Sequence, residues 1–474
     1  MDINMSSDTI AAIATAMSPS GIGIVRISGD EALAIIDRIY RSKNNNVRLN
    51  DCKSHTIHYG YIYDGDEVVD EVMVLLMKAP NSYTREDTVE IDCHGGVYVM
   101  KRILETVIKY GARPAEPGEF TKRAFLNGRL DLTQAESVID VINAKNDYAL
   151  KSSLNQLKGS VHEEVKKIRD EIIYQIAFIE SALDDPEHIS LEGYPDKLMA
   201  KTRGLNQELK KLIDSADNGK MLKDGIRTVI LGKPNAGKSS LLNVLVGEDK
   251  AIVTSVAGTT RDVLEESIKL HGIGLNMIDT AGIRDTEDEV EKIGVEKARK
   301  YANQADLVIY VVDSSRELDE NDEEIIELIR DKKVIVLLNK TDLEPVVTEE
   351  QIKDKFREIY EGEEKHDDSL HVIRTSTKDN TGIDEFEKTI QDMFFAGRIA
   401  VNDEIYITNQ RHKEALVEAY DSLKMVQKSL EDEMPEDFYS IDLMSAYAAL
   451  GRIIGEEVGE DLVNEIFSKF CMGK

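Results

Sequence analysis

Residues 232–239, Gly-Lys-Pro-Asn-Ala-Gly-Lys-Ser, fit the phosphate-loop pattern G-x-x-x-x-G-K-[ST]. The apolar run before them predicts a strand, and the run after them predicts a helix. In that setting, glycines let backbone N–H groups wrap around phosphates, and the N-terminus of the helix adds its dipole. Lys238 would bridge the terminal phosphates, and the hydroxyl of Ser239 would hold Mg²⁺. The chain is therefore predicted to bind a nucleoside triphosphate.

Three later segments, each placed after a predicted strand, indicate which base is bound. Asp279 opens the segment Asp-Thr-Ala-Gly and suits an outer-sphere ligand of Mg²⁺ that senses the γ-phosphate. Asn339 opens Asn-Lys-Thr-Asp, in which the carboxylate of Asp342 can accept both N–H groups on the Watson–Crick edge of guanine. Ser376 and Thr377 would close over the base through backbone N–H groups. In this order, the segments predict a GTPase.

The residue that orients the attacking water is not the one used by Ras-type enzymes. Their glutamine corresponds to Ile283, whose side chain cannot bond to water. Thr260, in the first switch at 254–262, can reach Mg²⁺ with its hydroxyl and the γ-phosphate with its N–H. The amide oxygen of Asn235, together with backbone carbonyls, forms a candidate site for a monovalent cation that supplies the charge of an arginine finger. Carboxylates of the second switch, 284–291, could reach the water, although each alone is more simply a solvent-exposed acid.

These segments supply the whole candidate GTP site, with Lys238 and Thr260 as catalytic residues. The predicted GTP-binding residues are Asn235, Ala236, Gly237, Lys238, Ser239, Ser240, Thr254, Ser255, Val256, Ala257, Gly258, Thr259, Thr260, Asp279, Thr280, Ala281, Gly282, Asn339, Lys340, Asp342, Ser376 and Thr377. Ser239 and Thr260 are the predicted Mg²⁺ ligands.

Composition narrows the function classes. The net charge is −31, from 90 acidic and 59 basic residues in a chain of 474, which argues against broad binding to a polyanion. Any nucleic-acid contact should be confined to a local basic groove and helped by a partner. The three cysteines are far apart in the sequence, which favours a reducing compartment, and we expect a cytoplasmic location. No apolar run reaches about 18 residues, so no membrane span is expected.

Changes of sequence period along the chain predict its domain organisation. Residues 1–120 alternate β-rich runs with helical stretches, as in an α+β domain. Between Leu150 and Ile172, apolar residues recur every three or four positions, which predicts one long amphipathic helix. The prediction is a multidomain α/β protein in which a GTPase domain at 221–395, with a mostly parallel sheet, is inserted into an all-α helical domain formed by 121–220 and 396–474.

Several motifs together resemble one known family over essentially the whole chain. These motifs are 232–239, Ala-Gly-Thr-Thr-Arg-Asp at 257–262, Asp-Thr-Ala-Gly at 279–282, the segment 117–132 and the terminal Phe-Cys-Met-Gly-Lys at 470–474. The sequence resembles the bacterial tRNA modification GTPases of the MnmE (TrmE) family. Met472 stands where the family usually has isoleucine, and Thr377 stands where alanine is commoner.

The resemblance implies site residues that spacing alone does not reveal. The N-terminal domain would have a folate-binding-like fold, form a homodimer, and bind a 5-formyl- or methylene-tetrahydrofolate. Glu291 matches the acid that positions the hydrolytic water. Cys471 matches a reactive thiol, although it is equally well explained as a small residue packing the tail. The implied folate residues are Arg26, Glu90, Arg129 and Lys474, and the implied potassium residues are Asn235, Thr254, Val256 and Thr259.

The resemblance also implies a reaction and partners. With the flavoprotein MnmG (GidA), such a GTPase adds a carboxymethylaminomethyl-type group to C5 of the wobble uridine, position 34, of certain tRNAs. The alternative of a different class is a ribosome-assembly GTPase, a switch that binds RNA without covalent chemistry. An assembly factor has no use for a folate pocket or a C-terminal thiol, and it usually carries a basic domain that this acidic chain lacks.

Overall fold

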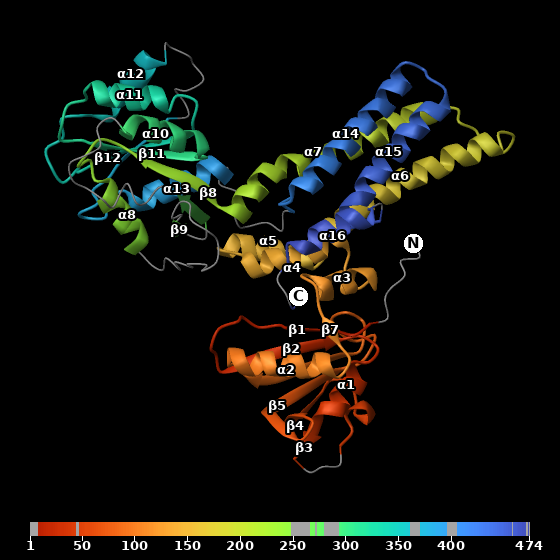
Figure 1. Ribbon diagram of the computed structural model, residues 1–474. Coiled ribbons are helices and arrows are strands. Elements are labelled where there is room, and N and C mark those ends of the chain that lie inside the picture. Colours follow the sequence, from red (N-terminus) through yellow and green to blue (C-terminus); the bar gives the residue numbers. More distant parts are fainter. Residues whose placement is uncertain are drawn as a thin grey trace. The chain divides into compact units, whose positions relative to one another are not determined.

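A computed structural model gives the arrangement of the chain (Figure 1). It describes residues 8–43, 47–247, 266–270, 273–278, 293–360, 370–395, 405–456, 458–470 and 473. Contacts divide the chain into two compact units. The first combines Met1–Asn143, Ser153–Lys210 and Glu414–Lys474, and the second combines Ala144–Ser152 with Lys211–Lys413.

A seven-stranded sheet of order β3-β4-β5-β6-β2-β1-β7 builds the N-terminal part of the first unit. All neighbouring strands are antiparallel except β1 and β7. Helices α1 and α2 lie against one face of this sheet (Figure 1). Alternate residues of the strands bury apolar side chains against these helices, while the opposite face carries polar side chains at its centre. The strands and helices are β1 (Ile10–Ile13), β2 (Ile22–Ser28), α1 (Ala32–Ile39), β3 (Tyr40–Ser42), β4 (Thr56–Asp64), β5 (Glu67–Met77), β6 (Thr88–His94), α2 (Val97–Lys109) and β7 (Arg113–Pro114).

Helices from two distant stretches of the chain complete the first unit. Within it, α15 (Glu436–Ile454) packs along α6 (Ser160–Asp184), and the guanidinium of Arg169 on α6 lies 4.0 Å from the ring centre of Tyr447 on α15. The other helices are α3 (Glu119–Leu126), α4 (Leu132–Asn143), the first part of α7 (Tyr194–Asp224), most of α14 (Gln410–Glu431) and α16 (Glu460–Ser468).

The single long helix predicted between Leu150 and Ile172 is wrong. The structure has α5 (Asp147–Leu157) and then α6, with Gly159 between them at φ +100°, a left-handed conformation that ends a helix. The apolar stripe remains in phase on α6, where Val165 and Ile172 are buried, whereas Leu150 on α5 is exposed.

The second unit holds a six-stranded sheet of order β13-β12-β11-β8-β10-β9, parallel except for β9. Separate apolar clusters lie on its two faces, which is why its central strands read as continuous apolar runs. Its strands are β8 (Ile226–Leu231), β9 (Glu266–Leu270), β10 (Ile273–Met277), β11 (Leu307–Asp313), β12 (Val334–Asn339) and β13 (His371–Arg374). Its helices include α8 (Lys238–Gly247), α10 (Ile293–Gln304), α11 (Glu320–Leu328), α12 (Glu349–Ile359) and α13 (Ile383–Phe395).

This arrangement confirms the predicted fold class of an α+β N-terminal domain, a helical domain and a domain with a mostly parallel sheet. In a parallel sheet, the carboxyl ends of the strands meet at one edge, so the motifs that follow β8, β12 and β13 gather there. Within the described parts of the chain, no helix has the length and apolar character needed to span a membrane.

Candidate functional site

The phosphate loop connects the end of β8 to the start of α8, as its motif predicts. Three of its residues have positive φ: Gly232 at +151°, Asn235 at +61° and Gly237 at +107°. A Cβ at Gly232 would lie 2.3 Å from the carbonyl oxygen of Val311 on β11, so only glycine lets the loop pass this close to the neighbouring strand. The loop therefore curls tightly over the edge of the sheet.

Lys238 lies at the first position of α8 and reaches back across this loop. Its Nζ donates to the carbonyl oxygens of Gly232 at 2.7 Å and Lys233 at 2.8 Å. Burial lowers the pKa of Lys238, because the ammonium is removed from water and, among the described residues, no carboxylate offsets the loss. An anionic phosphate placed over the loop would supply that missing charge.

Asn339 joins the three loops that the sequence assigns to the nucleotide. Its side-chain nitrogen donates to the carbonyl of Ala236 at 2.9 Å, and its side-chain oxygen accepts from the backbone N–H of Thr377 at 3.2 Å. Asn339 is 1% exposed, and a Cβ at Gly237 would come within 2.1 Å of its Nδ2. The structure thus brings together the phosphate loop and both guanine loops.

The two charged residues of the first guanine loop have different partners. The carboxylate of Asp342 accepts from the hydroxyl of Ser376 at 3.3 Å and lies 3.5 Å from Nζ of Lys378. Nζ of Lys340 lies 2.6 Å from Oδ2 of Asp313, the last residue of β11. Burial acts to raise the pKa of Asp313, but the hydrogen bond from Lys340 and those from the next loop hold it below its ordinary value.

Sequence reasoning missed Asp313. A carboxylate that ends an apolar strand run, at the same edge as the other loops, was the available signal.

Several predicted site residues lie outside the described part of the chain. This applies to the first switch, to the whole Asp-Thr-Ala-Gly segment and second switch, and to much of the C-terminal tail. The residues concerned are Thr254, Ser255, Val256, Ala257, Gly258, Thr259, Thr260, Asp279, Thr280, Ala281, Gly282, Glu291, Cys471 and Lys474. Of the predicted Mg²⁺ ligands, Ser239 is described at the second position of α8. Elsewhere among the described residues, no three His, Cys, Asp or Glu side chains cluster as a metal site.

A second constellation lies on the outer face of the N-terminal sheet, opposite α1 and α2. Arg26 on β2 and Glu90 on β6 are register partners, and their side chains form an ion pair of 2.7 Å. They are only 14% and 16% exposed. The guanidinium of Arg26 lies 5.5 Å from the ring centre of Tyr83 and 5.6 Å from that of Phe120, which explains how a charged residue is held on a half-buried surface.

Two further predicted or terminal residues meet this pair. Arg129 lies over the ring of Tyr83 at 4.7 Å, so two guanidiniums share one aromatic ring. The carbonyl of Gly473 accepts from Nη1 of Arg26 at 3.2 Å, which brings the C-terminal tail to the N-terminal sheet. Sequence reasoning missed Tyr83 and Phe120, because an aromatic residue in a loop or helix carries no specific signal by itself.

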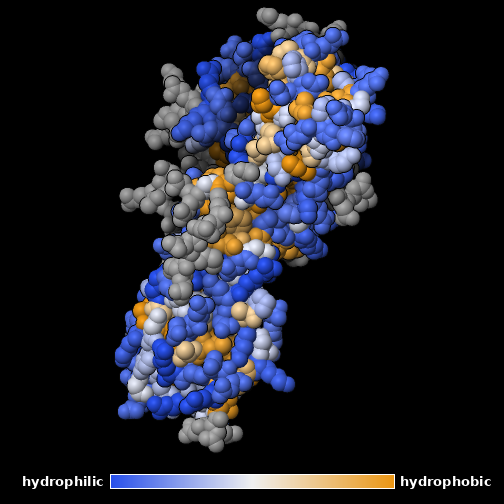
Figure 2. Space-filling view, turned by 90° about the vertical axis from the view of Figure 1, so that its right-hand side faces the viewer, coloured by the Kyte–Doolittle hydropathy of each residue, from blue (hydrophilic) through white to orange (hydrophobic). Residues whose placement is uncertain are grey.

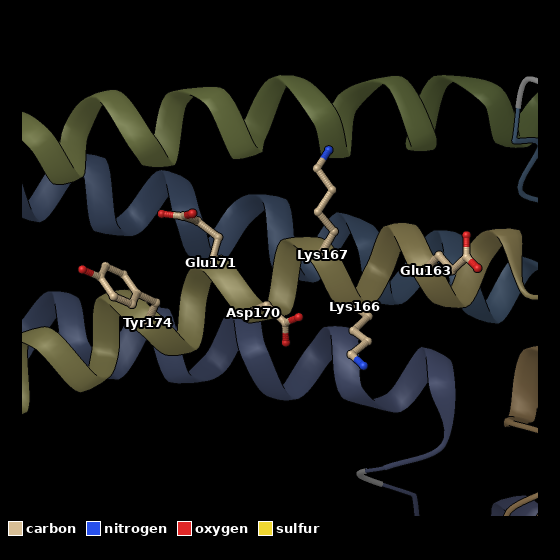
Figure 3. A pocket seen from close by; sticks show the side chains of 6 residues that line it. All are labelled: Glu163, Lys166, Lys167, Asp170, Glu171 and Tyr174. Carbon is tan, nitrogen blue, oxygen red and sulfur yellow. The ribbon is translucent and has the colours of Figure 1, made fainter.

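A charged hollow on α6 is not a good candidate for a site. Figure 3 shows its side chains along one helix, with Lys167 pointing toward α7. Lys167 lies 3.6 Å from both Glu164 and Glu208, and Lys201 lies 3.2 Å from Glu171, as expected of a solvated helix face with paired charges. The residues that line it are Glu163, Lys166, Lys167, Asp170, Glu171 and Tyr174.

Comparisons with known proteins agree across the chain. Residues 9–129 match the family model described as "GTP-binding protein TrmE N-terminus", and residues 132–471 match "MnmE helical domain". The protein named "tRNA modification GTPase MnmE" in Lachnoclostridium phytofermentans is 60% identical over 99% of this chain and 100% of its own length. Proteins of the same name from Alkaliphilus oremlandii and Clostridioides difficile are 48% and 47% identical, each over 98% of this chain and 99% of their own. The chain therefore belongs to the MnmE family of tRNA modification GTPases.

Proposed function

We propose that this GTPase acts in the cytoplasm, with a flavoprotein partner of the MnmG type, to place a carboxymethylaminomethyl-type group on C5 of uridine 34 in certain tRNAs. The observation that carries the proposal is the contact of Arg26 with both Glu90 and Gly473. It brings a carboxylate, a guanidinium and the tail that contains Cys471 to one surface. A nucleotide switch alone does not need such a surface.

The chemistry of that surface fits a tetrahydrofolate derivative as the one-carbon carrier. Guanidinium groups such as those of Arg26 and Arg129 suit the carboxylates of the glutamate tail of folate. The carboxylate of Glu90 suits the amide edge of a pterin, and the ring of Tyr83 offers an apolar contact. When bound, the folate supplies the one-carbon unit, while these residues bind and orient it. Lys474 is the further binding residue in this proposal, and Cys471 is the candidate nucleophile.

For GTP hydrolysis, we assign Mg²⁺ to Ser239 and Thr260. A potassium ion belongs to Asn235, Thr254, Val256 and Thr259, and Glu291 positions the water. The positive φ of Asn235 supports the potassium site, because Asn235, unlike Gly232 and Gly237, is not a glycine, and residues other than glycine that are held in this conformation cluster at functional sites. A bound cation places positive charge beside the phosphates, where negative charge develops during transfer.

We further propose that the N-terminal sheet forms the contact in a homodimer. On its outer face, Ile57, Tyr59 and Met73 are 64%, 51% and 41% exposed. Exposing these apolar side chains to water is unfavourable, and a second copy of the chain packed on this face would bury them. Figure 2 shows hydrophobic surface among hydrophilic residues on the N-terminal part of the protein, at the bottom of the view. Met73→Glu should convert the dimer to a monomer in light scattering. Val68→Glu, at an exposed apolar residue near the start of the same strand, is the comparison for an added charge alone.

The deciding experiment is nucleoside analysis of tRNA from a deletion strain. Loss of the wobble-uridine modification, restored by the wild-type protein, is the expected result. Complementation by Cys471→Ser separates the roles of the tail, because this change keeps the shape but removes the stronger nucleophile. Normal tRNA modification together with accumulated ribosomal subunits would instead identify a ribosome-assembly GTPase.

A further inference from the structure

The second residue of the phosphate loop, Lys233, is tied to a helix that no motif assigns to the nucleotide. Its Nζ lies 2.6 Å from Oδ2 of Asp322 and 2.9 Å from Oδ2 of Asp319, at the start of α11. The two carboxylates differ in their surroundings, because Asp322 is 1% exposed and Asp319 is 52% exposed. Only the contact with Asp322 is therefore shielded from water and from salt.

Asp322 is itself fixed by the core of the nucleotide domain. Its Oδ1 accepts from the hydroxyl of Tyr310 at 2.7 Å, and its Oδ2 accepts from the backbone N–H of Asp319 at 2.9 Å. Tyr310 is completely buried in the middle of β11. Burial, followed by the nearby Asp322 carboxylate, raises the pKa of Tyr310, so the phenol keeps its proton and remains a donor. A chain of polar contacts thus runs from the central strand through α11 to the phosphate loop.

The main chain of Lys233 continues this connection toward the phosphates. Its carbonyl oxygen accepts from Nζ of Lys238 at 2.8 Å and from the backbone N–H of Ala236 at 3.3 Å. The residue that is anchored through its side chain is therefore also the residue that orients the phosphate-binding lysine. Displacing the anchor would move the carbonyl that Lys238 contacts.

We propose that Lys233, held by the buried carboxylate of Asp322, is a positioning residue that sets the phosphate loop for GTP binding. It acts through Lys238 and the loop backbone, without touching the nucleotide. A buried ion pair adds little net stability, because the cost of desolvating two charges offsets their attraction. The ion pair instead acts on position. The short contacts of Lys233 and Tyr310 with Asp322 hold the phosphate loop in one position relative to β11. This proposal does not depend on the tRNA reaction.

The test compares the same chemical change at the two carboxylates that contact Lys233. In Asp322→Asn, the amide oxygen can still accept from Tyr310, but the N–H groups that replace Oδ2 face the ammonium of Lys233 and the backbone N–H of Asp319, so Lys233 should be released. We expect the dissociation constant for GTP, measured by calorimetry, to rise at least tenfold, while kcat at saturating GTP changes less than twofold. Asp319→Asn is the matched control, because asparagine preserves the N-cap of α11, and its dissociation constant should stay within twofold.

A second pair of variants keeps the test decisive if Asp322→Asn folds poorly. The double variant Lys233→Met with Asp322→Asn removes both charges, nearly keeps both side-chain volumes and leaves an amide oxygen to accept from Tyr310, so its melting temperature should stay near that of the wild type. We expect it to show the same tenfold weakening of GTP binding, and Lys233→Arg, which keeps the ion pair, to bind GTP within threefold of the wild type. Unchanged GTP affinity in the double variant would overturn the proposal, as would equal losses in Asp322→Asn and Asp319→Asn.

Discussion

The substitution Gly473→Ala tests whether the C-terminal tail is held at the N-terminal sheet. Gly473 has φ +89°, a conformation that L-residues avoid. A Cβ there would lie 2.4 Å from the carbonyl oxygen of Ile13 and 2.8 Å from Cα of Ala14. Both are backbone atoms: Ile13 is the last residue of β1, and Ala14 follows it. Because backbone cannot rotate away as a side chain can, the simplest relief is for the tail to leave its position.

The size of the effect follows from these contacts. An L-residue in the left-handed region costs roughly 1–2 kcal/mol, and strained positions of this kind cost about 1–3 kcal/mol altogether. The same change also weakens the hydrogen bond from Arg26 to the Gly473 carbonyl, which is 3.2 Å long. Since 1.4 kcal/mol is a factor of ten, the population with a released tail should rise by about 5- to 150-fold.

Trypsin cleavage after Lys469 measures this release. Lys469 is exposed, but the next residue, Phe470, is buried, so cleavage requires the tail to open. The cleavage rate of Gly473→Ala, followed by mass spectrometry, should rise by the factor above. Gly65→Ala is the control, because Gly65 has φ +65° and a Cβ added there would have no atom within 4 Å. This variant therefore carries the strain of an L-residue at positive φ, but its Cβ does not collide with the backbone. If both variants are cleaved at the wild-type rate, the tail is not held by this contact.

At the guanine loop, Asp342→Asn should lower GTP affinity at least tenfold, because each charge-assisted hydrogen bond contributes about 1.5–3 kcal/mol. The variant should bind xanthosine triphosphate better than GTP. Unchanged GTP binding would show that Asp342 does not recognise the guanine. GTP hydrolysis should be faster in potassium than in sodium, and equal rates in the two salts would contradict the potassium site. Glu291→Ala should slow hydrolysis without changing nucleotide affinity, and normal turnover of this variant would contradict the role of Glu291 in positioning the water. Arg129→Ala should weaken tetrahydrofolate binding in calorimetry but leave GTP hydrolysis intact, whereas unchanged folate binding would exclude this contact. By NMR, His94 should titrate above its ordinary pKa because its Nδ1 bonds to Asp70 at 2.7 Å, and Asp70→Asn should lower that pKa. The pair then contributes its full stabilisation below about pH 6.5 and loses it as the pH rises through the raised pKa of His94. Identical titrations of His94 in the wild type and in Asp70→Asn would refute the pairing.

Local sequence sufficed for the nucleotide domain because its signals are short in range. A phosphate loop needs an apolar strand before it and a helix after it, and all three are contiguous between Ile226 and Gly247. Continuous apolar runs predicted buried parallel strands, and β11 and β12 have that form. The convergence of Asn339 and Thr377 on the loop then follows, since parallel strands end at one edge.

Contacts between distant residues were decided only by the tertiary structure. Alternation along β2 and β6 indicates which side chains share a face, but not that these two strands pair, so the ion pair of Arg26 with Glu90 depends on strand register. The tail contact at Gly473 joins residues 447 positions apart, and the anchor of Lys233 depends on where α11 begins. The same limit explains the helix break at Gly159, because an apolar stripe continues in phase across a left-handed glycine and gives no sign of it. The spacing of apolar residues in the sequence shows which face of a helix or strand is apolar. Which element packs against that face depends on the packing of the whole chain.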